Sequence, residues 1–212
     1  MYLPAHFDET RPSEIVRILR EHPLGALVIN GPGGLDANHL PFEYEPTAKG
    51  FGTLRAHVAR ANPIWQQAKD GDNVLVIFRG VEGYISPNWY PSKHETHRQV
   101  PTWNYQVVHV HGHLTILDNE QYVRGVVARL TREHERRVNA ERAWRMTDSD
   151  AHYIDTMLDA IVGIEIQISR IVAKSKLSQN KELRDRMGAS SALESGNTPL
   201  AEAMRDCLPP ND

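Results

Sequence analysis

Cysteine is almost absent from this chain, because Cys207 is its only one. A single cysteine excludes a disulfide within the chain and favours a reducing compartment, which predicts a cytoplasmic protein. The first residues carry neither a basic segment nor a long apolar run, so no signal peptide is expected. No stretch approaches the roughly eighteen apolar residues of a membrane span.

An excess of basic charge is also missing. The 24 Lys and Arg residues are outnumbered by 27 Asp and Glu residues, giving a formal charge of -3. This balance provides no overall attraction to DNA or to an anionic membrane, so nucleic-acid binding would need a local basic face. With 212 residues and 40% hydrophobic content, the composition is that of a globular protein with one sizeable core.

Several catalytic and phosphate-binding motifs are missing from the sequence. It contains no glycine-rich loop of the dinucleotide or P-loop type, since Gly31-Pro-Gly-Gly34 has the composition of a hairpin turn. It also contains no serine nucleophile elbow. His94-Glu-Thr-His97 lacks the spacing of a zinc-protease helix and lies in a segment rich in Pro and Ser.

The hydrophobic pattern predicts short strands joined by tight turns, with helices around them. This organisation favours an antiparallel barrel over a doubly wound sheet, and therefore a mainly β fold with peripheral helices (α+β). We expect one domain over residues 1–187, followed by a polar C-terminal tail over 188–212. Helices are predicted over 12–22, after Asn62-Pro63, from a capping box of Asp118 and Gln121 to about 137, over 149–158, and as a short charged helix after Asn180. Strands are predicted over 25–30, 35–44, 51–57, 74–79, 107–117 and 164–169.

Two aromatic segments are typical of a surface that holds a flat ligand. Pro101 fixes its own φ and favours an extended Val100, so residues 102–105 are presented at the start of a strand. Residues 84–90 form a second segment of this kind, with Trp89 and Tyr90. The alternative is that these aromatic side chains fill a core or a dimer interface.

An anion site is predicted where the third strand runs into a short helix. Arg55 and Arg60 lie close to Asn62, which precedes Pro63 at the expected helix start. The alternative is that the arginines are surface charges and Asn62 is only a cap. Together with the aromatic segments, this site would suit flavin mononucleotide (FMN), whose phosphate and ring need different surroundings.

Two further clusters invite a functional interpretation. His109, His111 and His113 share one strand face, but no carboxylate or cysteine nearby completes a metal shell, so we expect exposed or interface histidines and no metal site. The arginines between residues 124 and 145 could contact DNA phosphates. Because Glu133, Glu135 and Glu141 are interleaved with them, a solvated helix with i,i+4 ion pairs is favoured.

Several ordered motifs together resemble the PaiB-type FMN-binding negative transcriptional regulators. The resemblance extends from Met1 to about Met187 and implies an antiparallel split β-barrel of the FMN-binding type, related to pyridoxamine phosphate oxidases. It also implies a homodimer with each FMN in a groove at the subunit interface. The motifs are Met1-Tyr-Leu-Pro-Ala-His-Phe7, Asn38-His-Leu-Pro41, His57-Val-Ala-Arg-Ala-Asn-Pro63, Tyr84-Ile-Ser-Pro-Asn-Trp-Tyr90, Val100-Pro-Thr-Trp-Asn-Tyr105 and Lys176-Leu-Ser-Gln-Asn180.

The resemblance also implies the residues that bind the cofactor. It places a phosphate site on the turn after the third strand, a ring contact on a neighbouring strand, and two segments that close the rim or come from the partner subunit. The phosphate residues are Arg60, Ala61 and Asn62, with Arg55 and His57 on the strand before them; the ring residues are Asn38, His39 and Leu40; the rim residues are Thr102, Trp103, Asn104, Tyr105, Lys176, Gln179 and Asn180.

Two functions from different classes follow. The first is a dimeric FMN-binding repressor whose contact with DNA is direct or indirect, since no helix-turn-helix is evident. The alternative is a flavin-dependent oxidoreductase, of the FMN reductase or oxidase kind, whose substrate and catalytic residues the sequence does not identify. A third possibility is a split barrel that has lost its flavin and keeps only the dimer.

Overall fold

The computed structural model describes residues 1–207, apart from the side chain of Asn139. The chain forms two compact units. Unit 1 comprises residues 1–21, 79–108 and the described residues from 172 onward. Unit 2 comprises residues 22–78 and 109–171.

The strands form one sheet with the order β2-β1-β5-β6-β7-β4-β3. The pairs β1–β2, β1–β5, β3–β4 and β4–β7 are antiparallel, and β2 and β3 are the edges of this order. The predicted mainly β, antiparallel class with peripheral helices is thus confirmed. The strands are β1 (Leu24–Gly31), β2 (Gly34–Pro41), β3 (Glu43–Glu45), β4 (Thr53–Ala59), β5 (Asn73–Ile85), β6 (Thr102–Leu117) and β7 (Ile161–Lys176).

Period-two burial explains these strands in unit 2. Ile164, Ile166 and Ile168 of β7 are buried, whereas Gln167 and Ser169 between and after them are exposed. The β1–β2 hairpin closes through paired Gly31 and Gly34. Gly34 has a φ of 98°, a left-handed conformation that favours glycine. The alternating pattern and the hairpin therefore appear where the sequence predicts them.

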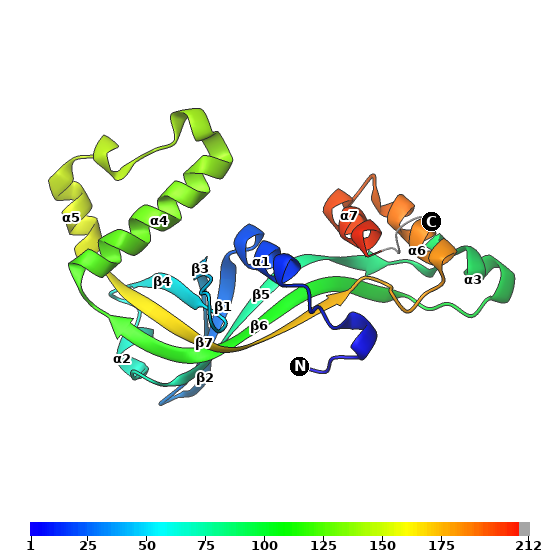
Figure 1. Ribbon diagram of the computed structural model, residues 1–212, viewed down its shortest axis with the longest axis horizontal. Helices are drawn as coiled ribbons and strands as arrows, with labels where there is room; N and C mark the ends of the chain where they lie inside the picture. The colour runs from blue at the N-terminus through cyan, green and yellow to red at the C-terminus, as the bar shows by residue number, and fades with distance from the viewer. Residues whose placement is uncertain (208–212) are drawn as a thin grey trace. The chain divides into compact units, whose positions relative to one another are not determined.

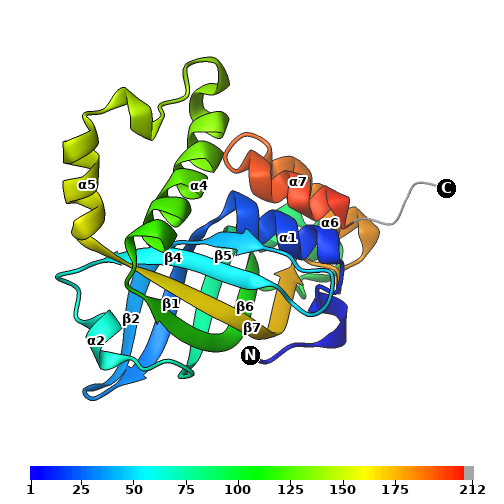
Figure 2. The same cartoon turned by 60° about the vertical axis from the view of Figure 1, so that its left-hand side comes forward.

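Unit 2 carries α2 (Ile64–Gln67), α4 (Glu120–Asn139), the short η3 (Ala140–Arg142) and η4 (Met146–Asp148), and α5 (Ala151–Asp159). Figure 2 shows α4 running over β4. Val123 of α4 packs with Ile154 and Leu158 of α5. Asn119 caps α4 by accepting a hydrogen bond from the Tyr122 amide, so the predicted cap at Asp118 was wrong by one residue.

Unit 1 carries η1 (Ala5–Phe7), α1 (Pro12–Glu21), η2 (Pro87–Trp89), α3 (Pro91–Thr96), α6 (Leu183–Leu193) and α7 (Thr198–Asp206). α6 and α7 lie side by side, drawn in orange and red in Figure 1. Leu193 of α6 and Leu200 and Met204 of α7 belong to one buried cluster with Ile85, Tyr90 and Leu177.

These two helices correct the prediction of a polar tail after residue 187. Residues 188–206 are largely helical and supply side chains to a core. Residues 208–212 of that predicted tail lie outside the described residues. The short charged helix predicted after Asn180 corresponds to the start of α6. The full length of α6 was missed because it buries polar side chains, among them Asp185, Arg186 and Ser190, and so has no clear apolar stripe.

The strands that carry the aromatic segments are longer than predicted. β5 continues to Ile85, β6 begins at Thr102, and β7 continues to Lys176. Residues 84 and 102–105 are therefore strand residues, and Pro101 directly precedes a strand as the sequence indicates. Within the described range, no helix combines the length and apolar character that crossing a membrane requires.

Candidate functional site

The turn after β4 brings two predicted site segments of unit 2 together. Asn62 Nδ2 donates a hydrogen bond of 2.7 Å to Asn38 Oδ1 on β2, and Asn62 Oδ1 accepts one of 3.0 Å from the Ile64 amide. The turn itself is closed by the Asn62 amide, which donates to the Ala59 carbonyl at 2.8 Å. The predicted ring segment and the predicted phosphate segment are thus linked directly.

Arg60, in the same turn, holds a bidentate ion pair with a carboxylate. Its Nη1 and Nη2 donate to Asp118 at 2.8 and 2.6 Å, and its Nε donates to the Asp159 carbonyl at 2.7 Å. Trp65 Nε1 donates to the Arg60 carbonyl, and its ring centroid lies 5.8 Å from the guanidinium. The hydrogen bonds from Arg60 lower the pKa of Asp118. The exposed guanidinium is therefore held with the fork geometry that also suits a phosphate.

The helix after this turn contributes less than the sequence suggests. α2 is a single turn of four residues, Ile64–Gln67. A helix this short has little dipole and few free amides to offer an anion. Any anion site here therefore consists of side-chain donors.

Arg55 and His57 occupy alternate positions of β4, on the same strand face. Arg55 donates to Glu165 at 2.9 Å and also pairs with Glu45, so its charge is already neutralised. His57 Nδ1 is buried and lacks a hydrogen-bond partner in the described part of the chain. Burial lowers the pKa of His57.

The predicted ring residues alternate along β2. Asn38 is half-buried and Leu40 is buried, whereas His39 between them is exposed. On β1, Leu27 pairs with Asn38, Ala26 with His39 and Gly25 with Leu40. Asn38 and Leu40 thus share one face, and Asn38 forms the hydrogen bond to the Arg60–Asn62 turn.

A pocket of about 210 Å³ in unit 1 contains four predicted rim residues. Thr102, Asn104, Lys176 and Asn180 line it, together with Val100, Pro101, Ser178 and Lys181. Lys176 Nζ donates to Thr102 Oγ1 at 2.5 Å and to the Trp103 carbonyl. Asn104 Nδ2, fully buried, donates to Ser178 Oγ at 2.9 Å.

The other predicted rim residues do not line this pocket. The Trp103 side chain is 55% exposed and meets the Tyr84 ring edge-on at 6.4 Å. The Tyr105 ring lies 5.4 Å from Lys174 Nζ. Gln179 folds back on its own loop, where it accepts from the Leu177 amide and donates to the Ser175 carbonyl. Gln179 therefore shapes the loop.

Sequence reasoning missed Ser178 and Lys181 in the pocket, and Asp118 at Arg60. Ser178 lies inside the Lys176–Asn180 motif and Lys181 follows it directly, so both were within reach of a local argument. Asp118 is 58 residues from Arg60, and its role depends on a long-range contact that no local pattern indicates.

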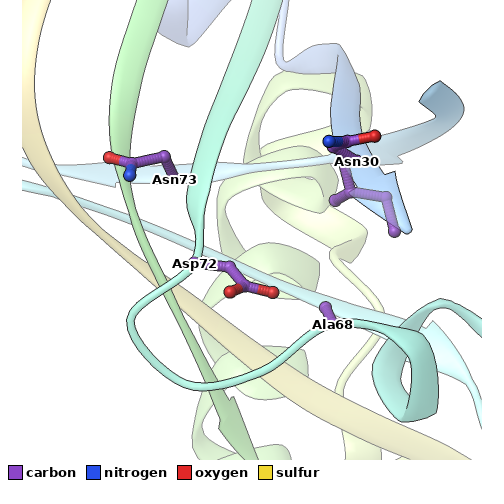
Figure 3. A pocket seen from close by; sticks show the side chains of 5 residues that line it. Asn30, Ala68, Asp72 and Asn73 are labelled. Carbon is purple, nitrogen blue, oxygen red and sulfur yellow. The ribbon is translucent and has the colours of Figure 1, made fainter. Parts of the chain in front are cut away.

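Unit 2 contains a second polar pocket of about 200 Å³. Figure 3 shows Asn30 on β1, and Ala68, Asp72 and Asn73 on the segment that leads from α2 into β5. Asp72 Oδ2 accepts a hydrogen bond from the Lys69 amide at 2.8 Å. No residue predicted from the sequence as a site residue lines this pocket.

The histidine cluster lies beside a cation, whereas arginines of α4 have carboxylate partners. His111 Nε2 lies 3.0 Å from Arg170 Nη2, and burial lowers the pKa values of His109 and His111. Across the described chain, no group of three or more His, Cys, Asp or Glu residues is arranged to hold a metal. On α4, Arg124 pairs with Glu120 and Asp155, and Arg129 with Glu43.

Comparison with known proteins identifies the family. The model of the family described as "Putative FMN-binding domain" matches residues 1–170. The chain belongs to this FMN-binding family. It is also 30% identical to "Protease synthase and sporulation protein PAI 2" of Bacillus subtilis (strain 168), covering 98% of this chain and 96% of the relative. The resemblance to PaiB-type proteins, and FMN as the cofactor, are confirmed by these matches.

Solved structures of the same fold include flavoproteins. The FAD and heme binding protein from Mycobacterium smegmatis superposes with a TM-score of 0.58 at 15% identity, over 90% of this chain and 80% of that one. The flavocytochrome Anf3 from Azotobacter vinelandii superposes with a TM-score of 0.56 at 12% identity, over 80% of this chain and 69% of that one. The predicted antiparallel split β-barrel of the FMN-binding family is confirmed as the fold.

Proposed function

We propose that this member of the FMN-binding family is a dimeric, cytoplasmic regulatory protein of the PaiB type that holds the FMN phosphate at the Arg60-Ala61-Asn62 turn. The near full-length similarity to a protein named for protease synthesis and sporulation in Bacillus subtilis supports a regulatory role. Bound FMN would supply a redox-active ring system, and the residues of this chain would bind and orient it.

The donors at the turn fit a phosphate. Arg60 offers a planar fork of N–H groups, and the Asn62 and Asn38 amides are joined beside it. Asp118 now occupies the fork that a phosphate would take, so the ligand must share or displace this carboxylate. His57, with its partnerless buried Nδ1, is a further polar group on the strand that enters the turn.

One observation carries this proposal. Asn38 and Asn62 are 24 residues apart in the sequence, and each was assigned to the flavin site on a separate motif, yet their side chains form a 2.7 Å hydrogen bond. A shared ligand site needs the ring segment and the phosphate segment to be neighbours, and this hydrogen bond joins them. We propose that His39 and Leu40 also line the ring, and that residues 102–105, Lys176, Gln179 and Asn180 form the rim of the site.

The basic helix does not favour direct DNA binding. Arg124, Arg129, Arg136 and Arg137 of α4 all have carboxylate partners within the protein. A phosphate contact made by any of these four arginines would have to replace an existing ion pair, which reduces the gain from counterion release. We therefore propose that any effect on transcription is exerted without α4 reading DNA.

The direct test is reconstitution with FMN. Wild-type protein mixed with FMN and then desalted should retain the visible flavin spectrum. An Arg60→Ala, Asn62→Ala double variant should lose most of the flavin, whereas Arg132→Ala, which removes an exposed α4 charge, should retain it. Equal retention by all three proteins would refute the assignment of the phosphate site, and no retention by wild type would refute flavin binding.

A further inference from the structure

Three lysines of unit 1 lie close together without an acidic partner. Lys176 and Lys181 line the pocket at the start of β6, and Lys174 is the next residue on the same face of β7. These three ammonium groups donate hydrogen bonds to neutral oxygens. Lys174 donates to the Tyr2 carbonyl, Lys176 to the Thr102 hydroxyl and the Trp103 carbonyl, and Lys181 to the Gln99 side chain. None of the three forms an ion pair with a described residue.

This arrangement is electrostatically unfavourable in the absence of an anion. Burial lowers the pKa of Lys176, and the charges of Lys174 and Lys181 lower it further. Neutral oxygens and aromatic rings compensate only part of the cost of placing like charges together. A bound anion would offset the repulsion between the lysines, so the cluster favours a negatively charged ligand.

The pocket beside the lysines has the size and lining for one oxyanion group. No Asp or Glu lines it, and its polar side chains besides the two lysines are the hydroxyls of Thr102 and Ser178 and the amides of Asn104 and Asn180. Its volume of about 210 Å³ is below the roughly 300 Å³ at which pockets begin to enclose drug-sized molecules. It can thus take a charged group of a ligand, but not a whole ring system.

The pocket is already organised. Asn104 is fully buried and holds Ser178, and Gln179 pins the loop to its own backbone. Gln99 accepts from Lys181 and donates to Asp185, whose carboxylate also accepts from the amide and hydroxyl of Ser92. The nearest carboxylate in this network is therefore separated from Lys181 by Gln99 and is already occupied.

We propose that this lysine pocket of Thr102, Asn104, Lys176, Ser178, Asn180 and Lys181 binds an oxyanion of the phosphate type. Two ammonium groups with hydroxyl and amide donors converge from two segments, which suits a tetrahedral anion with oxygens in several directions. A planar carboxylate is better matched by the fork of an arginine, and no arginine lines the pocket. The proposal does not depend on where the flavin phosphate binds.

The test is an isothermal calorimetric titration of the purified protein with inorganic phosphate at constant ionic strength. Wild type should show saturable binding. A Lys176→Met, Lys181→Met double variant should bind at least about tenfold more weakly, because both point charges are lost. Lys69→Met, which removes one exposed charge from unit 2, should match wild type.

Folding of the variants is checked by circular dichroism. If the double variant does not fold, the single variant Lys181→Met is used, because Lys181 donates a hydrogen bond to Gln99 and lies against the Tyr90 ring, and neither contact is needed to hold a buried charge pair. Saturable binding in wild type that the lysine variants weaken supports the pocket. No saturation in wild type, or equal binding in all variants, overturns it.

Repeating the titration with FMN and with riboflavin identifies the source of the oxyanion. Displacement of phosphate by FMN and not by riboflavin would assign the pocket to the flavin's own phosphate, and would remove that role from Arg60. Independent binding of phosphate and FMN would assign it to a second phosphorylated ligand. Both results support an oxyanion pocket. An Arg60 variant that loses FMN binding but still binds phosphate would show that the FMN site at Arg60 and the lysine pocket are separate sites.

Discussion

At the scale of single residues, Arg60 and Asp118 are the most informative pair. The same guanidinium that is proposed to hold a phosphate is held by Asp118 through two hydrogen bonds. The substitution Asp118→Asn keeps the shape of the side chain but removes the negative charge that competes with the phosphate for Arg60. We expect FMN affinity to rise by about threefold to tenfold, with riboflavin affinity unchanged, in a fluorescence-quenching titration. A fall in FMN affinity would instead make Asp118 a residue that positions Arg60.

His57 should make the folding stability depend on pH. Burial lowers its pKa from the ordinary value of 6.5, so on acidification the unfolded chain binds a proton before the folded chain does. The contribution of this residue is complete above pH 6.5 and is lost as the pH falls below that value. Between about pH 7.5 and about pH 5.5, the His57→Leu variant should therefore lose less folding free energy than wild type, as measured by urea unfolding. Identical losses in the two proteins would show that His57 does not titrate differently on folding.

The candidate site was predictable from the sequence only in part. Local motifs led to Asn38 and Asn62, whose side chains meet, and to Thr102, Asn104, Lys176 and Asn180, which line one pocket. Their role in binding a cofactor stays a prediction. The motifs could not indicate that Arg55 pairs with Glu165 across 110 residues, or that Gln179 turns back on its loop. Ion-pair partners depend on tertiary contacts, which no short motif contains.

At the scale of elements, the sequence predicts the beginning of α6, as a short charged helix after Asn180, but not its full length. Strands such as β7 follow from alternating burial, because one face meets the core and the other meets water. α6 buries Asp185 and Ser190 as well as Ala189 and Leu193, so its polar residues are satisfied by hydrogen bonds inside unit 1. A polar helix of this kind is hidden from any argument based on hydrophobic periodicity.

Two glycine substitutions in helices test the packing of α6. A Cβ at Gly188 would lie 2.4 Å from the Trp89 carbonyl oxygen and 3.0 Å from Pro91 Cδ, so Gly188→Ala should destabilise the protein by about 1 to 3 kcal/mol. In α4, a Cβ at Gly125 would meet only the flexible end of Arg129 at 3.3 Å. Gly125→Ala should therefore stabilise by about 0.5 to 1 kcal/mol. The same sign for both in thermal unfolding would contradict the close packing at Gly188.

At the scale of the whole molecule, the exposed aromatic residues of unit 1 support the proposed dimer. Trp103 is 55% exposed and Tyr84 is 47% exposed, and their rings are in contact. Tyr84→Ser with Trp103→Ser should shift the protein from dimer to monomer in light scattering, because such rings dominate interface energetics. Trp144→Ser, which removes a 39% exposed indole from unit 2, should leave the dimer intact. A double variant that stays dimeric would place the interface elsewhere.

The central claim is that this chain binds FMN and grips its phosphate at the Arg60-Ala61-Asn62 turn. The most direct measurement compares the affinities of FMN and riboflavin, which differ only in that phosphate, for wild type and for Arg60→Ala, Asn62→Ala. We predict that wild type binds FMN at least about tenfold more tightly than riboflavin, and that the ratio falls close to one in the double variant. Equal affinities in wild type, or a ratio that the double substitution leaves unchanged, would contradict the account.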